Sequence, residues 1–160
     1  MVEIGYALSL PRPESHLFHV ETTMRGVADE HVDFVLPSWT PGSYRIRDFA
    51  RHVQDFSAGR LRWRKMDKAR WRVFTKGVRE VRIAYRVWAF ELTVRTCHLD
   101  ADHGYANGAG VFCYVDGQKD RPVRLRVRPP RGWRVFTGLD EIGPNLFRAS
   151  DYDALVDCPL

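Results

Sequence analysis

The sequence lacks the patterns that identify secreted, membrane-spanning and metal-ribbon proteins. Its three cysteines, Cys97, Cys113 and Cys158, are odd in number and far apart, and no two of them form a C-x-x-C pair. This spacing suggests neither a disulfide framework nor a zinc ribbon. The apolar runs are only a few residues long, which is too short to cross a bilayer. Glu3 and Gly5 interrupt any signal-peptide pattern. We therefore expect reduced thiols and a cytoplasmic location.

The composition indicates one globular domain. The chain has 160 residues, of which 44% are hydrophobic and 28% are charged, and this is ordinary usage for a globular protein. A chain of this length buries about 70% of its unfolded surface, which is enough for a sizeable core. The sequence shows no internal repeat, linker or low-complexity segment. We therefore expect a single domain over residues 1–160.

Four segments alternate between apolar and polar residues with a period of two, which is typical of strands with one buried face. They are Ile4–Leu10, Val32–Leu36, Val81–Val87 and Val123–Val127. Turn-forming proline, glycine and asparagine residues separate them. No long window keeps a helical period, although residues 45–55 have room for one helical turn before a strand. The pattern predicts an all-β domain, a single β-sandwich of mostly antiparallel strands with few or no helices.

Arginine dominates the charge. The chain has 25 Lys and Arg against 20 Asp and Glu, which gives a formal charge of +5. Two sets of arginines alternate with other residues, as on the solvated face of a strand: Arg60, Arg62, Arg64 and Arg124, Arg126, Arg128. Trp63 and Trp71 lie near basic residues, as in a weak single-strand nucleic-acid site. Acidic residues are almost as numerous along the chain, so we expect no nucleic-acid partner and no membrane partner.

The segment Pro37–Tyr44, with the sequence PSWTPGSY, is a shaped loop. Pro37 and Pro41 fix their φ angles and remove N–H donors, and Gly42 after Pro41 suits a tight turn. Trp39 is therefore held between two rigid corners. A large aromatic in such a place either plugs the end of the core or faces a ligand. A simple corner between two strands is the other interpretation.

Residues 98–108 contain two imidazoles and two carboxylates, which could hold a divalent metal. Neither histidine pair has the i, i+4 spacing of a helical zinc site. We therefore favour a solvated connection with incidental histidines, and a rim loop over a cleft is its other possible use.

Nucleophilic catalysis has little support in the sequence. Cys97 stands beside a base, His98, but adjacent residues of a strand point to opposite faces. The hydroxyl residues of the PSWTPGSY loop precede Asp48 and His52, yet no oxyanion arrangement accompanies them. We interpret these hydroxyls as turn caps.

The whole chain resembles the N-terminal domain of the glycyl aminopeptidase family, peptidase family sixty-one of the gluzincin metallopeptidases. The most specific motifs are PSWTPGSYRIRDFARHV at residues 37–53 and DYDALVDCP at residues 151–159. Less specific matches follow in the expected order: Tyr6–Pro11, Ser15–Phe18, Lys68, Trp71–Val73, Tyr85–Val87, Val94–Arg95, Leu99–Asp100, Gly132–Trp133 and Thr137–Leu139.

This resemblance implies a saddle-like β-domain that precedes a thermolysin-like zinc domain, with a PDZ domain beyond it. None of the six histidines lies in H-E-x-x-H, the motif that binds zinc and activates its water in this class. We therefore expect no catalytic residue, metal or cofactor in this chain, and zinc in the catalytic domain of a parent metalloaminopeptidase. The expected partners are that domain and, through it, a peptide substrate. The isolated domain could self-associate through an apolar face.

The resemblance also implies a site. An exopeptidase must limit the depth of its cleft so that only a free amino terminus fits, and a neighbouring domain can supply the walls. We expect Trp39 and Tyr44 to shape the pocket. The residues expected to make charged contacts to the substrate or the next domain are Arg45, Arg47 and Asp48. Residues 151–159 are expected to form a strand that leads into the active site.

A second class of function remains open, that of a freestanding binding module. Such a β-sandwich would grip a peptide or a glycan through exposed aromatic side chains. The candidates are Trp39, Trp63, Trp88 and Tyr105.

Overall fold

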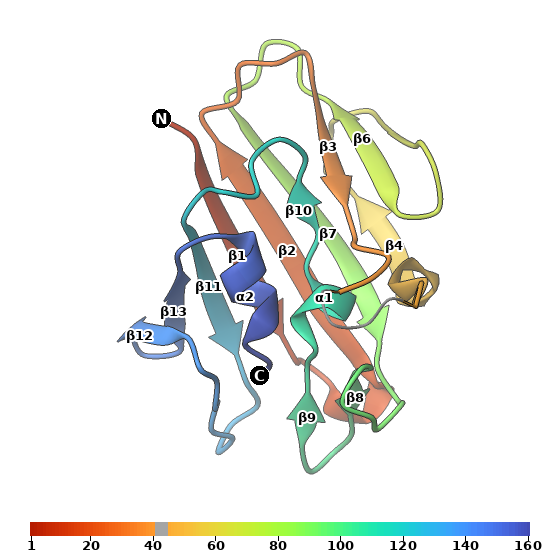
Figure 1. Ribbon diagram of the computed structural model, residues 1–160, viewed down its shortest axis with the longest axis vertical. Helices are drawn as coiled ribbons and strands as arrows, with labels where there is room; N and C mark the ends of the chain where they lie inside the picture. Colours follow the sequence, from red (N-terminus) through yellow and green to blue (C-terminus); the bar gives the residue numbers. More distant parts are fainter. Residues whose placement is uncertain (41–44) are drawn as a thin grey trace.

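A seven-stranded sheet forms one layer of the domain. The computed structural model describes residues 1–40 and 45–160, and Figure 1 shows their arrangement. The strand order in the large sheet is β12-β13-β11-β1-β2-β7-β4. The bounds are β1 (Glu3–Ser9), β2 (Leu17–Arg25), β4 (Val53–Ser57), β7 (Glu80–Trp88), β11 (Val123–Arg128), β12 (Asp140–Gly143) and β13 (Leu146–Ala149). The pair β1–β11 is parallel, and the other neighbours are antiparallel.

The second layer combines a smaller sheet, a hairpin and two short helices. The smaller sheet has the order β10-β3-β6-β5. Its strands are β3 (His31–Val35), β5 (Trp63–Lys65), β6 (Arg70–Phe74) and β10 (Tyr114–Val115). The hairpin pairs β8 (His98–Leu99) with β9 (Gly104–Tyr105), and the helices are α1 (Gly108–Val111) and α2 (Tyr152–Asp157). The 3-10 turns are η1 (Pro13–Ser15) and η2 (Phe49–His52). In Figure 1, β3, β6, β10, the β8–β9 hairpin and the two α-helices lie in front of or beside the large sheet.

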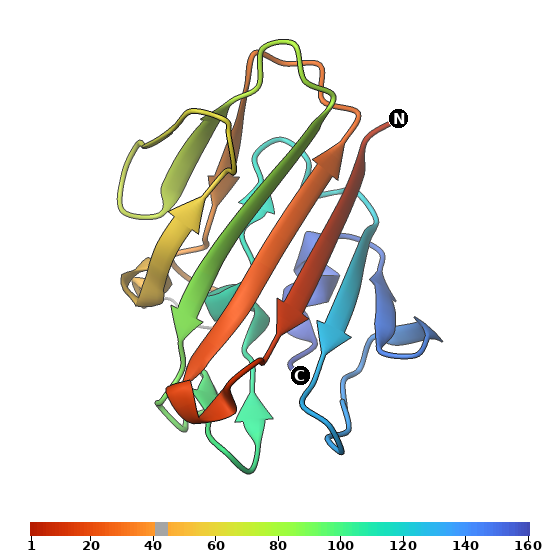
Figure 2. The ribbon, with the colours of Figure 1, turned by 180° about the vertical axis from the view of Figure 1, so that it is seen from behind.

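The predicted all-β sandwich with few helices is confirmed. Strands β1, β7 and β11 lie where the period-two pattern placed them, and η2 followed by β4 provides the predicted turn of helix before a strand. The outer face of β1, β2, β7 and β11 is turned toward the viewer in Figure 2. Within the described part of the chain, no helix is long and apolar enough to cross a membrane.

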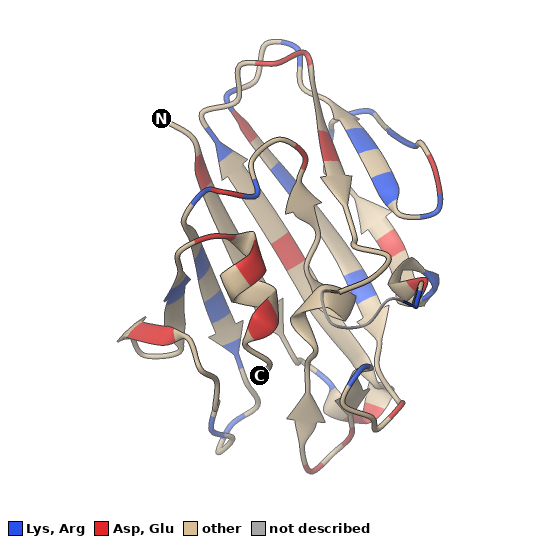
Figure 3. Ribbon diagram, in the orientation of Figure 1, with Lys and Arg blue, Asp and Glu red and all other residues tan. Residues whose placement is uncertain are grey.

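Alternation along each strand determines which side chains enter the core. In β11 the valines and the leucine are buried, whereas Arg124, Arg126 and Arg128 are exposed. This row of arginines is visible as blue bands on β11 in Figure 3. In β1, Ile4, Tyr6 and Leu8 are buried against the second layer. The predicted solvated row of arginines on this strand is therefore confirmed.

Two local predictions were wrong. Residues 151–159 were expected to form a strand, but they contain helix α2. The Asp151 carboxylate accepts a hydrogen bond from the Ala154 N–H at 2.7 Å, which is the interaction of a helix N-cap. Tyr152 and Leu155, three positions apart, are buried on one face of the helix. Residues 98–108 are not a simple solvated connection either, because they form the β8–β9 hairpin and begin α1.

Three buried tyrosines hold α1 in the core. The hydroxyl of Tyr85 donates to the Val111 carbonyl at 2.7 Å, that of Tyr152 to Phe112 at 2.7 Å, and that of Tyr6 to Cys113 at 2.9 Å. Carbonyls at the end of a helix have no partner within the helix, so these bonds satisfy groups that burial would otherwise leave unpaired. Burial raises the pKa of all three tyrosines, so they remain neutral donors. We call this set, Tyr6, Tyr85 and Tyr152, the tyrosine hub.

Helix α1 also packs closely against α2, and this contact gives a test. A Cβ added at Gly108 would lie 2.7 Å from the Val156 Cα, which is a backbone atom of α2. We expect Gly108→Ala to lower the free energy of unfolding by about 1–3 kcal/mol, because the two helices must separate to admit the methyl group. Urea denaturation followed by circular dichroism measures this change.

The matched control is Gly5→Ala on β1, where an added Cβ would meet no atom within 4 Å. We expect this variant to be at least as stable as the wild type, because alanine restricts the unfolded chain more than glycine does. Equal stability of the Gly108→Ala variant and the wild type would contradict the close packing of α1 on α2.

Candidate functional site

A surface hollow of about 410 Å³ lies between residues 45–52 and residues 90–97. The first segment precedes β4 and the second follows β7. These two strands are antiparallel neighbours, with Val53 opposite Val87, so both segments reach the same end of the sheet. The hollow is lined by Arg45, Ile46, Arg47, Phe49, Arg51, His52, Val87, Trp88, Phe90, Glu91, Thr93, Val94, Arg95, Thr96, Cys97 and Gly110. We call it the arginine hollow.

The arginine hollow carries an excess of positive charge. Four arginines line it, and Glu91 is the single carboxylate among its lining residues. Arg51 Nη2 lies 3.5 Å from the Glu91 carboxylate, which offsets one of these charges. The blue segments around η2 in Figure 3 belong to this region. The hollow is therefore suited to an acidic or carbonyl-bearing partner.

The histidine of the hollow is uncharged at neutral pH. Burial, with a further contribution from the charge of Arg51, lowers the pKa of His52. Its Nε2 accepts a hydrogen bond from Arg51 Nε at 3.0 Å, and its ring stacks on Trp88 with centroids 5.4 Å apart. Because Nε2 is occupied by the guanidinium, His52 is not arranged as a general base for a nearby hydroxyl.

Large apolar side chains surround the arginines and face solvent. The exposed fractions are 73% for Ile46, 48% for Phe90 and 81% for Val94. Several large apolar side chains gathered around one hollow indicate an interaction surface more than a solvated face. Arginine and aromatic residues are also the types enriched in protein interfaces.

The hollow is attached to the core through α1. Phe49 of η2 is buried beneath Gly110, where an added Cβ would lie 3.5 Å from the Phe49 ring and 3.4 Å from the Cys97 sulfur. On the other side, the Arg47 N–H donates to the Ser38 carbonyl at 2.7 Å, which draws residues 38 and 47 together. The tyrosine hub that fixes α1 therefore also fixes the floor of the hollow.

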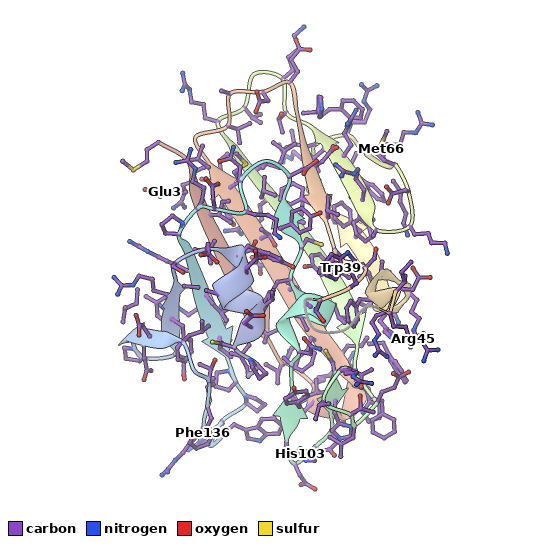
Figure 4. The ribbon with its side chains drawn as sticks, in the orientation of Figure 1. Glu3, Trp39, Arg45, Met66, His103 and Phe136 are labelled. Carbon is purple, nitrogen blue, oxygen red and sulfur yellow. The ribbon has the colours of Figure 1, made fainter. Side chains whose placement is uncertain are left out.

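The residues predicted for a cleft or an interface do not all meet there. Arg45 and Arg47 line the hollow. Asp48 lies beside it, in a left-handed conformation with φ 51°, and its carboxylate accepts a hydrogen bond from Lys68 Nζ at 3.3 Å. Trp39 is exposed, on the right in Figure 4, and is not among the lining residues. Tyr44 lies outside the described residues.

Segment 90–97 supplies much of the surface, although the sequence analysis assigned none of its residues to a site. Phe90, Glu91, Val94 and Arg95 all belong to it. A signal was present in the sequence, because apolar residues continue at every second position after Trp88, where β7 ends. Beyond the end of the strand, Phe90 and Val94 stay largely exposed.

The aromatic residues considered for a freestanding module are distributed over the fold. Trp63 lies on β5, Trp88 on β7, Tyr105 on β9 and Trp39 in the loop after β3. Of these four, Trp88 lines the arginine hollow.

The chain was compared with protein families and with solved structures. The family described as the peptidase M61 N-terminal domain matches residues 5–160. The crystal structure of an aminopeptidase N family protein from Idiomarina loihiensis is similar, with a TM-score of 0.89 and 34% sequence identity. The similarity covers 98% of this chain and 28% of that protein's chain, so this chain spans little more than a quarter of its length. The comparison with curated proteins gives no match.

The thiols give a test of the site's chemistry. Burial raises the pKa of Cys97 and of Cys113 to about 12, so both are protonated thiols at neutral pH. Cys158 is partly exposed. We expect Ellman's reagent to modify at most Cys158 in the folded protein at pH 8, and all three cysteines in denaturant, because the thiolate is the reacting form. Mass spectrometry of the modified protein identifies the residue. Rapid modification of Cys97 in the folded chain would contradict its assignment as a structural thiol.

Proposed function

Since this chain belongs to the peptidase M61 family as an N-terminal domain, we propose that it is the non-catalytic scaffold of a zinc-dependent aminopeptidase. In this proposal it packs on a thermolysin-like zinc domain of a longer protein that also carries a PDZ domain. The arginine hollow, together with Trp39 and Tyr44, contributes one wall of the substrate cleft. The zinc ion, the hydrolytic step and any preference for an amino-terminal glycine belong to the rest of that protein.

The composition of the arginine hollow carries this proposal. Ile46, Phe90 and Val94 are exposed around one depression. Removing apolar surface from water stabilises a complex by roughly 25 cal/mol per Å², so a partner that covers these side chains gains free energy. The arginines that flank them would pair with carboxylates of the partner. A covering domain of the same longer protein supplies such a partner at a high local concentration.

The charge of the hollow restricts where a substrate would lie. The free α-amino group of a peptide is cationic at neutral pH or close to it, and Arg45 and Arg47 would repel it. The amino terminus would therefore lie away from this wall, near acidic groups of the catalytic domain. The two arginines would instead contact backbone carbonyls of the substrate or carboxylates of that domain.

The freestanding module has less support. Its candidate aromatic residues lie on three different strands and one loop. The exposed apolar side chains of Ile46, Phe90 and Val94, in contrast, line one hollow. A glycan or peptide platform would need aromatic faces side by side. The domain assignment therefore remains the better explanation of this surface.

Trp39 provides the first test, made in the full-length enzyme. We expect Trp39→Ala to lower kcat/KM for small amino-acid amides by about 10-fold or more, because a wall of the cleft loses its largest side chain. The melting temperature should change by about 2 °C or less, since the side chain is exposed. Steady-state kinetics and a thermal melt measure the two effects.

The matched control is Phe136→Ala. Phe136 is also an exposed aromatic residue, and it lies at the lower left in Figure 4, away from Trp39. We expect wild-type kinetics from this variant. Unchanged kinetics for Trp39→Ala, combined with a large loss of stability, would show that Trp39 is a core residue in the complete enzyme.

Ile46 provides the second test, which addresses docking between domains. Placing a carboxylate at the centre of a desolvated contact is costly. In calorimetry of the full-length protein, we therefore expect the Ile46→Asp variant to unfold in two transitions. This domain should unfold in the first, at a lower temperature than the main transition.

Ile142→Asp is the control, because Ile142 is also exposed but lies on β12, at the opposite edge of the large sheet from β4. It should leave the calorimetric trace as in the wild type. Identical traces for the wild type and the Ile46→Asp variant would place the domain interface elsewhere.

A further inference from the structure

We propose that the β8–β9 hairpin binds a divalent transition-metal ion of the Zn²⁺ class through His98, Asp100 and His103. This site is separate from the catalytic zinc expected elsewhere in the longer protein. It also departs from our sequence-based expectation of incidental histidines in a solvated loop. It does not depend on the function proposed above, and it can be tested on this chain alone.

The register of the hairpin brings the three ligands to one face. His98 is opposite Tyr105 and Leu99 is opposite Gly104, so the next pair is Asp100 and His103. The Asp100 N–H donates to the His103 carbonyl at 3.0 Å and closes the turn. Side chains two residues apart on a strand share a face, as do side chains directly opposite each other. The pattern H-x-D-x-x-H thus forms a ligand set on a hairpin without the i, i+4 spacing of a helical site.

The distances are close to those of a metal site. His98 Nε2 lies 2.9 Å from Asp100 Oδ2, and His103 Nδ1 lies 3.3 Å from Asp100 Oδ1. The ligand atoms of the three residues all lie within 4.8 Å of one another. Ligands bonded to tetrahedral zinc at about 2.0–2.1 Å are separated by roughly 3.3 Å. The widest pair therefore has to close by about 1.5 Å at most, which a rotation of one side chain can supply.

Two of the ligands are already fixed, and the third can adjust. Asp100 Oδ1 accepts hydrogen bonds from the N–H groups of Asp102 at 2.8 Å and His103 at 3.0 Å, which orient the carboxylate. His98 is buried, and its ring stacks on Phe90 with centroids 5.3 Å apart. The His103 side chain is 56% exposed and lies at the foot of the molecule in Figure 4. It can turn toward the ion, and water can complete the coordination from the open side.

The donor set selects the kind of ion. Imidazole nitrogens suit zinc, nickel and copper, whereas magnesium and calcium prefer oxygen ligands throughout. His98 Nδ1 is buried, and no hydrogen-bond partner for it is found among the described residues. Metal binding at Nε2 places the proton on this nitrogen. A metal-bound histidine whose other ring nitrogen has no hydrogen-bond acceptor typically binds the metal about 10–100-fold more weakly. We therefore expect micromolar affinity, weaker than that of a closed structural zinc site.

Metal binding at this hairpin would stiffen a border of the arginine hollow. Phe90 lines that hollow and stacks on His98. The hairpin also leads directly through Ala106 and Asn107 into α1. An ion that ties Asp100 and His103 to His98 would restrict the turn and, through Phe90, the start of segment 90–97.

The test is a calorimetric titration of the untagged 160-residue chain with zinc chloride. We expect one ion per chain with a micromolar Kd, a rise in melting temperature of about 5 °C or more at saturation, and no heat with magnesium chloride. In NMR spectra, zinc should shift the imidazole signals of His98 and His103 and leave those of His31 in place.

Two variants and one control keep the proposal falsifiable. We expect His103→Asn and Asp100→Asn each to weaken zinc binding at least 10-fold. The amide oxygen introduced by Asp100→Asn can still accept both turn N–H groups, so this variant preserves the hairpin while it removes the charge. His31→Asn, at the exposed start of β3, should bind as the wild type does. The proposal fails if the wild type shows no binding at about 1 mM zinc, if both hairpin variants bind normally, or if His31→Asn abolishes binding.

Discussion

Three consecutive backbone carbonyls, those of Val111, Phe112 and Cys113, lie in the core where water cannot reach them, and each accepts a hydrogen bond from a tyrosine hydroxyl. An unpaired carbonyl in this environment would cost about 1–3 kcal/mol. The donors come from β1, β7 and α2, so the bonds connect the large sheet, the end of α1 and the C-terminal helix. The position of α1 in turn determines how α2 packs on Gly108 and how Phe49 packs beneath Gly110. The floor of the arginine hollow therefore depends on interactions made well inside the domain.

This arrangement separates the scaffold from the surface that meets a partner. The strands supply a rigid sandwich, and the hollow is built from the two segments that flank one end of the β4–β7 pair. Binding residues commonly occupy loops that a rigid framework holds in place. The arginines of β11 show the contrasting case, because they form a solvated row on the outer face of the sheet. Arginine content alone does not distinguish these roles. What distinguishes Arg45 and Arg47 is that exposed Ile46, Phe90 and Val94 surround them.

Local pattern predicted the fold class and several strands of the framework, but only part of the site. Strands β1, β7 and β11 follow from alternation, because burial of one face of a strand leaves a period of two in the sequence. Helix α2 did not follow, since its six residues are too few for a helical period to stand out. Arg45 and Arg47 could be selected from their motif, but segment 90–97 joins them only through the pairing of β4 with β7. The set of His98, Asp100 and His103 likewise depends on a hairpin register that the sequence analysis did not consider.

The parallel pairing of β1 with β11 has a consequence for how the chain folds as it is synthesised. Strand β1 is made first, and β2 can pair with one of its edges soon afterwards. Its other edge is completed only when β11 emerges, since Ile4 lies opposite Val123. At about 5–20 residues per second, that delay is on the order of ten seconds. During this interval the nascent sheet presents an open strand to other polypeptides on the ribosome. The extent of misassembly would therefore depend on the rate of translation and on chaperones that bind this edge.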